Sequence, residues 1–162
     1  MDVSGYQHSD SVTVGRDPGS VYAIISDVSR IGELSPVCKS GAWEDDAQAG
    51  KEGAWFTGHN VLGSYTWDTH CKVVAATPGR EFTFVNYGPG RESGLVRWGY
   101  AFEPDGAGTR VTETWQLLPA YVDFVTSGDP KADVKARLDG MAQMARDGIK
   151  ETLANLKLVA ES

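Results

Sequence analysis

Six segments with strand-like alternation follow one another between residues 38 and 117, and this run constrains the fold more than any other feature. Within each segment apolar and polar residues alternate, as in strands with one buried face. Short clusters of Gly, Pro, Asp and Ser separate them, and such clusters close hairpins. We therefore expect consecutive segments to pair as an antiparallel meander. The segments are KSGAWED, GAWFTGHNV, SYTWDTHCKVVAAT, REFTFVNY, GLVRWGYAFEP and TRVTETWQLL.

A further strand and two short helices are expected before the meander. Residues 8–15, HSDSVTVG, show the two-residue period of a half-buried strand. Asp17 can cap a helix that has Pro18 in its first turn. A second short helix, RIGELS, is expected to begin with Ser29 as its cap and to end before Pro36, because proline cannot supply the hydrogen bond needed to continue it.

The C-terminal part of the chain has the pattern of one long amphipathic helix. After a Gly/Pro loop at TSGDP, apolar residues recur over residues 131–158 at spacings of three, four and seven, including Met141 and Ala145. The helix would be roughly 40 Å long. Gly140 and Gly148 interrupt it, so we expect either close packing or a slight bend there.

This order of elements predicts an α+β protein with a helix-grip architecture. A first strand and the six-stranded meander would form a curved seven-stranded sheet, with the long helix packed on its concave face. The 162 residues contain no fixed-period repeat and no long linker. We expect one domain, residues 1–162, with residues 1–7 flexible.

Composition and charge argue against several classes of function. The net charge of -7 repels phosphates, and the 15 Lys and Arg residues are scattered, so nucleic acid is not expected as a partner. The N-terminus lacks the pattern of a signal peptide and no apolar run is long enough to span a membrane, which predicts a cytoplasmic protein. Cys38 and Cys71 are expected to be reduced thiols, with no metal site and no cofactor.

The stretch TWDTHCKVV, residues 66–74, places Asp68, His70 and Cys71 close together in sequence. Adjacent side chains of a strand point to opposite faces, so His70 and Cys71 cannot meet. Lys72 marks the outer face, which it would share with Asp68 and His70. The preferred interpretation is an exposed Asp68–His70 ion pair, with a catalytic pair as the alternative; Cys71 would lie inside as a small hydrophobic residue.

The same alternation predicts an aromatic inner face for the sheet. If the turn at EPDGAGTR pairs Phe102 with Val111, then Tyr100 lies opposite Glu113 and Trp98 lies opposite Trp115. Packing against the helix alone is one explanation for so many rings, and a cavity is the preferred one. The inward residues on this reading are Trp67, Thr69, Phe82, Phe84, Asn86, Val96, Trp98, Tyr100, Phe102, Val111, Glu113, Trp115 and Leu117.

Glu113 is anomalous because a carboxylate on an aromatic face must pair, hydrogen-bond or keep its proton. One interpretation is that Tyr100, Asn60 or His59 simply satisfies it. The other is that Glu113 is a polar anchor or an acid/base group in a cavity, with Tyr100 as its hydrogen-bond partner. Both can hold together. Alternation alone does not decide which face of residues 54–61 points inward, since each face carries one aromatic ring.

Several stretches, taken in order, resemble one known family. They are DVSRIGELSP, FTGHN, WDTHCKVVAATPGREFTF and RWGYAFEPDGAGTRVTETW. Together they are similar to the START-like superfamily, also called Bet v 1-like or SRPBCC, and within it to the polyketide cyclase/dehydrase-type proteins common in actinobacteria. The family often has Trp before the Ser-Pro pair where this chain has Leu34, a change at the expected rim of the pocket. The resemblance favours Phe56, Gly58 and Asn60 as the inward set on the third strand.

The resemblance implies three hypotheses, since this fold carries several functions. The first is a protein, monomeric or homodimeric, that binds a hydrophobic or amphipathic small molecule such as a polyketide, lipid or aromatic compound. Polar atoms of the ligand would be oriented by Glu113, Tyr100, Asn60 and either Arg97 or His59. The ligand-binding candidates are Phe56, Asn60, Trp67, Thr69, Phe82, Phe84, Trp98, Tyr100, Phe102, Glu113, Trp115, Met141 and Ala145.

The second hypothesis is a polyketide cyclase or dehydratase, with Glu113 and Tyr100 as the catalytic candidates. The third is a protein-interaction module with a solid core. For the first two, the Gly-rich loops TSGDP and GPGRES are candidates for gating the opening.

Overall fold

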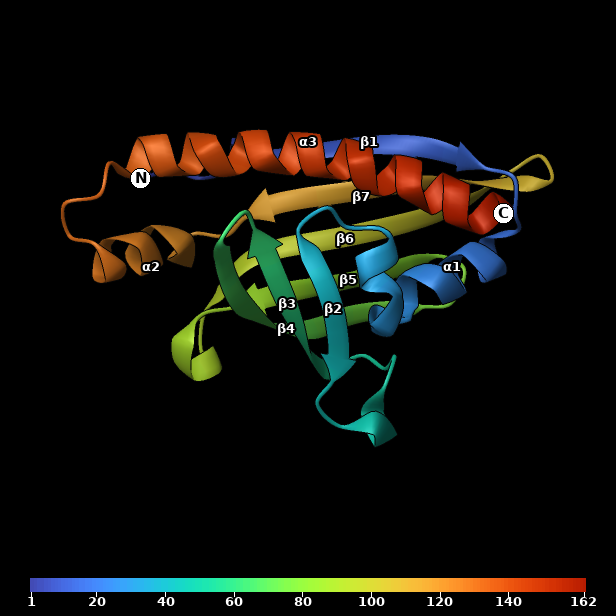
Figure 1. Ribbon diagram of the computed structural model, residues 1–162, viewed down its shortest axis with the longest axis horizontal. Coiled ribbons are helices and arrows are strands. Elements are labelled where there is room, and N and C mark those ends of the chain that lie inside the picture. The colour runs from blue at the N-terminus through green and yellow to red at the C-terminus, as the bar shows by residue number, and fades with distance from the viewer.

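The computed structural model describes residues 1–162 and contains one antiparallel sheet of seven strands in the order β1-β7-β6-β5-β4-β3-β2 (Figure 1). Consecutive strands from β2 to β7 are neighbours, and β1 adds to the free edge of β7. The predicted meander and the predicted α+β helix-grip fold are therefore confirmed. The strands are β1 (Gln7–Val14), β2 (Cys38–Trp43), β3 (Trp55–Leu62), β4 (Tyr65–Thr77), β5 (Glu81–Tyr87), β6 (Gly94–Asp105) and β7 (Gly108–Leu117).

Three α-helices and three short 3-10 helices complete the chain. None of the helices combines the length and the apolar character needed to cross a membrane. The helices are α1 (Pro18–Ser26), η1 (Val28–Glu33), η2 (Asp46–Gln48), η3 (Pro89–Arg91), α2 (Ala120–Gly128) and α3 (Val134–Glu161).

The long helix α3 lies alongside β1 and β7, and the other end of the sheet, with β2 and β3, folds forward toward it (Figure 1). In the same view β2 and β3 pass in front of β5, which makes the curvature visible. The Asp133 side chain caps α3 by accepting a hydrogen bond from the Ala136 amide, so the helix begins a little later than predicted. Its buried face is formed by Leu138, Ala142, Ala145, Ile149, Thr152, Leu153, Leu156 and Ala160.

The register between β6 and β7 is the one predicted from the turn. Phe102 pairs with Val111, Tyr100 with Glu113, and Trp98 with Trp115. Phe102 itself lies deep in the core, where its ring packs 5.4 Å from the ring of Tyr22 on α1. Turn geometry and strand alternation thus fix which side chains face each other beneath α3.

The first two helices begin with aspartate caps. Asp17 accepts a hydrogen bond from the Ser20 amide and caps α1, as predicted. The predicted cap of the second helix was wrong. Asp27, not Ser29, fills that role by accepting from the Ser29 amide, so η1 starts at Val28. The α1 helix and η1 are therefore joined by the single residue Asp27.

Helix α2 was not predicted from the sequence. Its nine residues include only two buried ones, Tyr121 and Val125, and the N-cap residue before it, Pro119, makes no side-chain capping bond. Neither a long apolar period nor a capping residue marks it. The TSGDP stretch that was expected to be a loop forms the end of this helix and the turn after it.

The first residues of the chain contact the rest of the protein. Val3 is buried, and the Tyr6 hydroxyl donates a 2.7 Å hydrogen bond to the Asp139 carboxylate on α3. The expected single domain over residues 1–162 and the flexibility of residues 1–7 stay predictions.

Helix η1 packs directly on strand β2, where Gly41 permits a close approach. A Cβ atom at Gly41 would lie only 2.5 Å from the Val28 carbonyl oxygen. A side chain there must push the backbone of η1 away from the strand. The close contact between η1 and β2 therefore requires glycine at position 41.

Gly41→Ala is expected to destabilise the protein by about 1–3 kcal/mol, because the added methyl group meets backbone rather than a flexible side chain. Urea denaturation measures the change. Gly140→Ala is the matched control: a Cβ there has nothing within 4 Å, and replacing glycine in a helix should stabilise by up to about 1 kcal/mol. An unchanged midpoint for Gly41→Ala would contradict the close approach.

Candidate functional site

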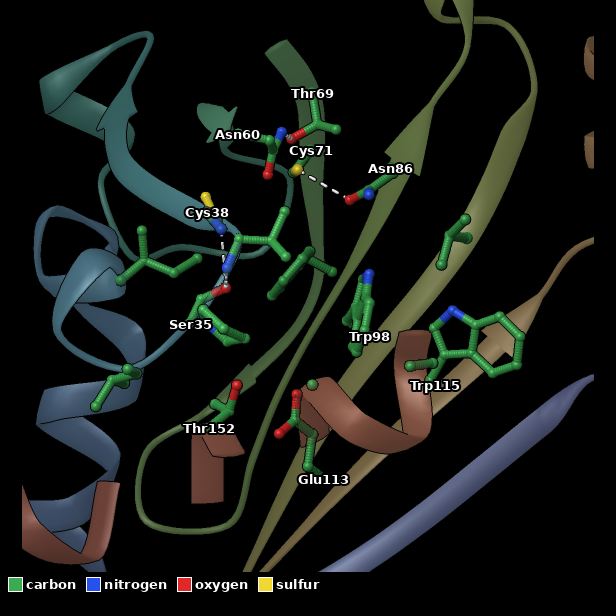
Figure 2. Close-up of a pocket in the computed structure, with 18 of the residues that line it drawn as sticks. Ser35, Cys38, Asn60, Thr69, Cys71, Asn86, Trp98, Glu113, Trp115 and Thr152 are labelled. Carbon is green, nitrogen blue, oxygen red and sulfur yellow. Dashed lines mark hydrogen bonds between the residues drawn. The ribbon is translucent and has the colours of Figure 1, made fainter. Parts of the chain in front are cut away.

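A cavity of about 200 Å³ lies between the concave face of the sheet and α3 (Figure 2). Of the 26 residues that line it, 18 are hydrophobic. They come from the α1–η1–β2 region, from strands β3 to β7, and from α3. The site is thus an apolar cavity with a small number of polar groups, the usual composition of a small-molecule site.

The cavity exists because α3 presents small side chains to the sheet at this level. Ala145, Gly148 and Thr152 face the space, with Met141 and Met144 nearer the N-terminal end of the helix. Gly148 was expected to mark close packing or a bend, but a Cβ there would have nothing within 4 Å. Close packing is therefore excluded, and Gly148 leaves part of the space open.

Twelve of the thirteen ligand-binding candidates line the cavity, the exception being Phe102. Phe102 is on the inner face but lies farther along β6, against α1, because the sheet extends beyond the cavity. The third strand turns Phe56, Gly58 and Asn60 inward. The candidates that line the space are Phe56, Asn60, Trp67, Thr69, Phe82, Phe84, Trp98, Tyr100, Glu113, Trp115, Met141 and Ala145.

Apart from Leu34, which was expected at the rim of the pocket, the wall formed by residues 25–38 was not predicted from the sequence. This segment contains η1 and an irregular connection, which have no regular period from which to infer an inward face. Thr152 was seen as part of the apolar stripe of α3 but was not proposed for the site, and helical spacing from Ala145 could have found it. The lining residues that were not among the ligand-binding candidates are Ile25, Val28, Ile31, Leu34, Ser35, Pro36, Val37, Cys38, Cys71, Asn86, Val96, Met144, Gly148 and Thr152, of which Cys71, Asn86 and Val96 were expected on the inner face and Leu34 at the rim.

Glu113 is the ionisable acid of the cavity wall. Its residue surface is 2% exposed, and Figure 2 shows its carboxyl group pointing toward the cavity. The Tyr100 hydroxyl donates a 2.8 Å hydrogen bond to Oε2, whereas the buried Oε1 has no partner. Burial raises the pKa of Glu113 to about 8, although the bond from Tyr100 acts in the opposite direction. At neutral pH Glu113 is therefore mainly a neutral acid.

Tyr100 is a hydrogen-bond donor and not a source of charge. Burial, followed by the nearby Glu113 carboxyl group, raises the pKa of Tyr100 well above its ordinary value. Its hydroxyl thus keeps its proton at neutral pH. The Tyr100 hydroxyl therefore donates to one oxygen of the Glu113 carboxyl group, and the other oxygen, Oε1, has no partner in the protein.

A second group of polar side chains lies at the far side of the cavity from Glu113 (Figure 2). Asn60 Nδ2 donates to the Trp67 carbonyl oxygen at 3.2 Å and to Thr69 Oγ1 at 3.4 Å. Cys71 Sγ donates to Asn86 Oδ1 at 3.0 Å. These bonds orient the two amides and leave Asn60 Oδ1 and Asn86 Nδ2 without a protein partner.

The two cysteines are poor nucleophiles. Burial raises the pKa of Cys71 to about 12, and its thiol is bonded to an amide and not to a histidine. Desolvation also raises the pKa of Cys38, whose thiol donates to the Ser40 carbonyl oxygen. Both are free thiols, and nucleophilic catalysis would need the thiolate.

The expected Asp68–His70 pair is wrong, although both residues lie on the outer face. Asp68 sits opposite His59 in the β3–β4 register, and its carboxylate lies 2.8 Å from His59 Nδ1. His70 instead contacts Arg91, which forms a two-point ion pair with Glu44. Directly opposed residues of two strands are closer than residues two apart on one strand. No group of three or more His, Cys, Asp or Glu side chains is placed to hold a metal ion.

The residues expected at the entrance also need correction. The GPGRES and TSGDP stretches contribute no side chain to the cavity; Pro89 and Gly128 instead border a separate shallow hollow beside α2. Arg97 and His59, proposed as orienting groups, are exposed on the outer face, because they alternate with the inward residues. The segment Leu34–Cys38 does line the cavity.

The fold and cavity define a START-like, Bet v 1-like protein of the helix-grip class. A family model described as polyketide cyclase / dehydrase and lipid transport matches residues 7–161. The chain belongs to this family. A search of curated proteins gives no match.

Solved structures agree with this assignment. The solution NMR structure of a Polyketide_cyc-like protein from Corynebacterium glutamicum is 33% identical, with a TM-score of 0.71, over 99% of this chain and 94% of that one. The di-domain ARO/CYC StfQ from the steffimycin biosynthetic pathway is 14% identical, with a TM-score of 0.70, over 96% of this chain and 50% of that one. A crystal structure of a protein from Mycobacterium smegmatis is 13% identical, with a TM-score of 0.66, over 98% and 93%. The last two similarities concern the fold alone.

The raised pKa of Glu113 makes the stability of the protein depend on pH. Above pH 4.5 the unfolded chain releases the Glu113 proton, while the folded chain keeps it up to about pH 8. Stability should therefore fall with rising pH across this window, by about 1.4 kcal/mol per pH unit for this one group. Below pH 4.5 and above about pH 8 the contribution is constant.

Glu113→Gln removes this titration while keeping the shape of the side chain. We expect the stability of this variant, measured as its free energy of unfolding minus that of the unmodified protein, to increase steadily from pH 5 to pH 8. Urea denaturation of both proteins at one-unit intervals measures the difference. Parallel pH profiles would show that Glu113 is not desolvated.

Proposed function

We propose that this protein binds a hydrophobic or amphipathic small molecule, such as a polyketide, lipid or aromatic compound, in the cavity between the sheet and α3. The observation that carries the proposal is a largely apolar, aromatic-lined cavity with two separate polar groups. Apolar area removed from water stabilises a complex by roughly 25 cal/mol per Å² before the costs of association. Membership of the family supports a ligand-binding or cyclase role.

The two polar groups would set the orientation of the ligand. Glu113 and Tyr100 lie at one side, and the amides of Asn60 and Asn86 lie at the other (Figure 2). A ligand with polar atoms at two separated positions fits this arrangement better than a uniform hydrocarbon. A cytoplasmic location and a monomeric or homodimeric state stay predictions.

Gly148→Leu tests whether the cavity is the binding site. The added side chain would project into the open space at Gly148, so we expect at least a tenfold loss of affinity for any bound compound. Gly140→Leu is the matched control, because it changes the same helix at an exposed position. Compounds found by native mass spectrometry of the purified protein, or by thermal stabilisation with a polyketide and lipid panel, serve as ligands. Equal affinities for the two variants would place binding elsewhere.

A second candidate function is a cyclase or dehydratase reaction inside the same cavity. The observation that favours it is the pairing of a buried neutral acid with a tyrosine donor, which leaves the buried Oε1 without a partner. Such an acid can give a proton to, or take one from, a ligand that is held in position. The third hypothesis required a solid core, and the cavity argues against it.

For the catalytic alternative, Glu113→Gln should lower kcat by at least about a hundredfold, because an amide cannot transfer the proton. Turnover of poly-β-keto substrates is followed by chromatography and mass spectrometry. Tyr100→Phe should have a smaller effect, since it removes only the hydrogen bond to Oε2. Unchanged turnover in Glu113→Gln would exclude Glu113 as the acid/base group.

A further inference from the structure

We propose that the cavity selects uncharged ligands whose hydrogen-bond acceptor, a carbonyl oxygen above all, is contacted by Glu113. The inference rests on the proposed binding function and names its ligand class. It follows from which charged groups line the space and from how the carboxyl group of Glu113 is bonded.

The cavity wall contains no positive charge. None of its residues is Lys, Arg or His. Lys39 adjoins the wall, but its exposed ammonium group donates to the Pro36 carbonyl oxygen. A carboxylate or phosphate inside the cavity would lose its hydration without gaining a cation, at a cost of several kcal/mol. The wall therefore disfavours anionic ligands.

The bonding of Glu113 is poorly suited to a carboxylate as well. A buried carboxylate is usually stabilised by two or three donors, whereas Glu113 has one, from Tyr100, and Oε1 has none. A protonated carboxyl group instead has an O–H that needs an acceptor. If the proton is on Oε1, this O–H can donate to the carbonyl oxygen of a ligand beside Glu113, and Oε1 then has a partner. This geometry favours a neutral acceptor over an amine.

Few titratable groups surround Glu113, and none of those in the cavity wall is a cation that would favour its ionised form. Tyr100 on β6 is its hydrogen-bond partner, and Cys38 is the titratable residue that β2 contributes to the wall. Asp10 on β1 is opposite Glu113 in register but is exposed, and α3 contributes no titratable side chain to the wall. With the pKa of Glu113 raised to about 8, the donor is present at pH 6 and largely lost at pH 9.

Four naphthalenes of similar shape test the proposal on the intact protein. They are 2-acetylnaphthalene, which carries a carbonyl; 2-ethylnaphthalene, which has no acceptor; 2-naphthoate, an anion; and 2-naphthylmethylamine, a cation at pH 6. Affinities are measured by fluorescence titration or calorimetry at pH 6 and pH 9, for the unmodified protein first. These measurements require no variant to fold.

At pH 6 we expect 2-acetylnaphthalene to bind at least tenfold more tightly than 2-naphthoate and 2-naphthylmethylamine. Its advantage over 2-ethylnaphthalene should fall several-fold at pH 9, when the donor is lost. In Glu113→Leu that advantage should fall about tenfold at pH 6. In Glu113→Gln, whose amide does not titrate, the ratio of ketone affinities at the two pH values should be close to one.

The proposal is overturned if 2-naphthoate binds as tightly as the ketone. It is also overturned if the amine binds most tightly and Glu113→Gln abolishes that binding, which would indicate a cation site. If 2-ethylnaphthalene binds and Gly148→Leu weakens it, but the ketone has no advantage, only the ligand class is wrong. If none of the four binds and native mass spectrometry finds no small molecule, the binding function itself fails.

Discussion

One long helix must cover a concave sheet surface that carries more aromatic side chains than the helix can contact. Where α3 presents Leu138, Ile149 and Leu156, helix and sheet pack together and these side chains are fully buried. Where it presents Ala145, Gly148 and Thr152, its side chains are too small to fill the space above the sheet and a cavity remains. The alternation of large and small residues along α3 thus divides the interface into a packed core and a site. The proposed binding function depends on that division.

The cavity then determines the chemistry of the one acid in its wall. The β6–β7 register brings Tyr100 opposite Glu113, and burial among aromatic rings keeps the Glu113 carboxyl group protonated at neutral pH. A buried acid with one oxygen unbonded is a destabilising arrangement for an empty protein. Such groups are often retained at binding and catalytic sites, where the ligand supplies the missing partner. The binding and catalytic proposals differ only in whether the proton moves.

The sequence was sufficient wherever a regular period or a turn governed the structure. Alternation identified the inner faces of β4 to β7, the family resemblance identified that of β3, and the EPDGAGTR turn fixed the pairing of Tyr100 with Glu113. The sequence failed where neither existed: the irregular wall at Leu34–Cys38 has no period, and α2 has no side-chain cap and buries only Tyr121 and Val125. The partner of Asp68 was wrong because the opposing residue, His59, belongs to another strand. Placing Phe102 outside the cavity required knowledge of where α1 packs.

Intermolecular nuclear Overhauser effects between bound 2-acetylnaphthalene and the protein test the central claim most directly. If the cavity under α3 is the binding site, the naphthalene protons will show contacts with the Met141 methyl group and with the ring protons of Trp98 and Trp115, which line it. Contacts confined to exposed residues such as Leu62, Tyr65 and Phe124 would contradict the account, because the compound would then bind outside the space that the sheet and the helix enclose.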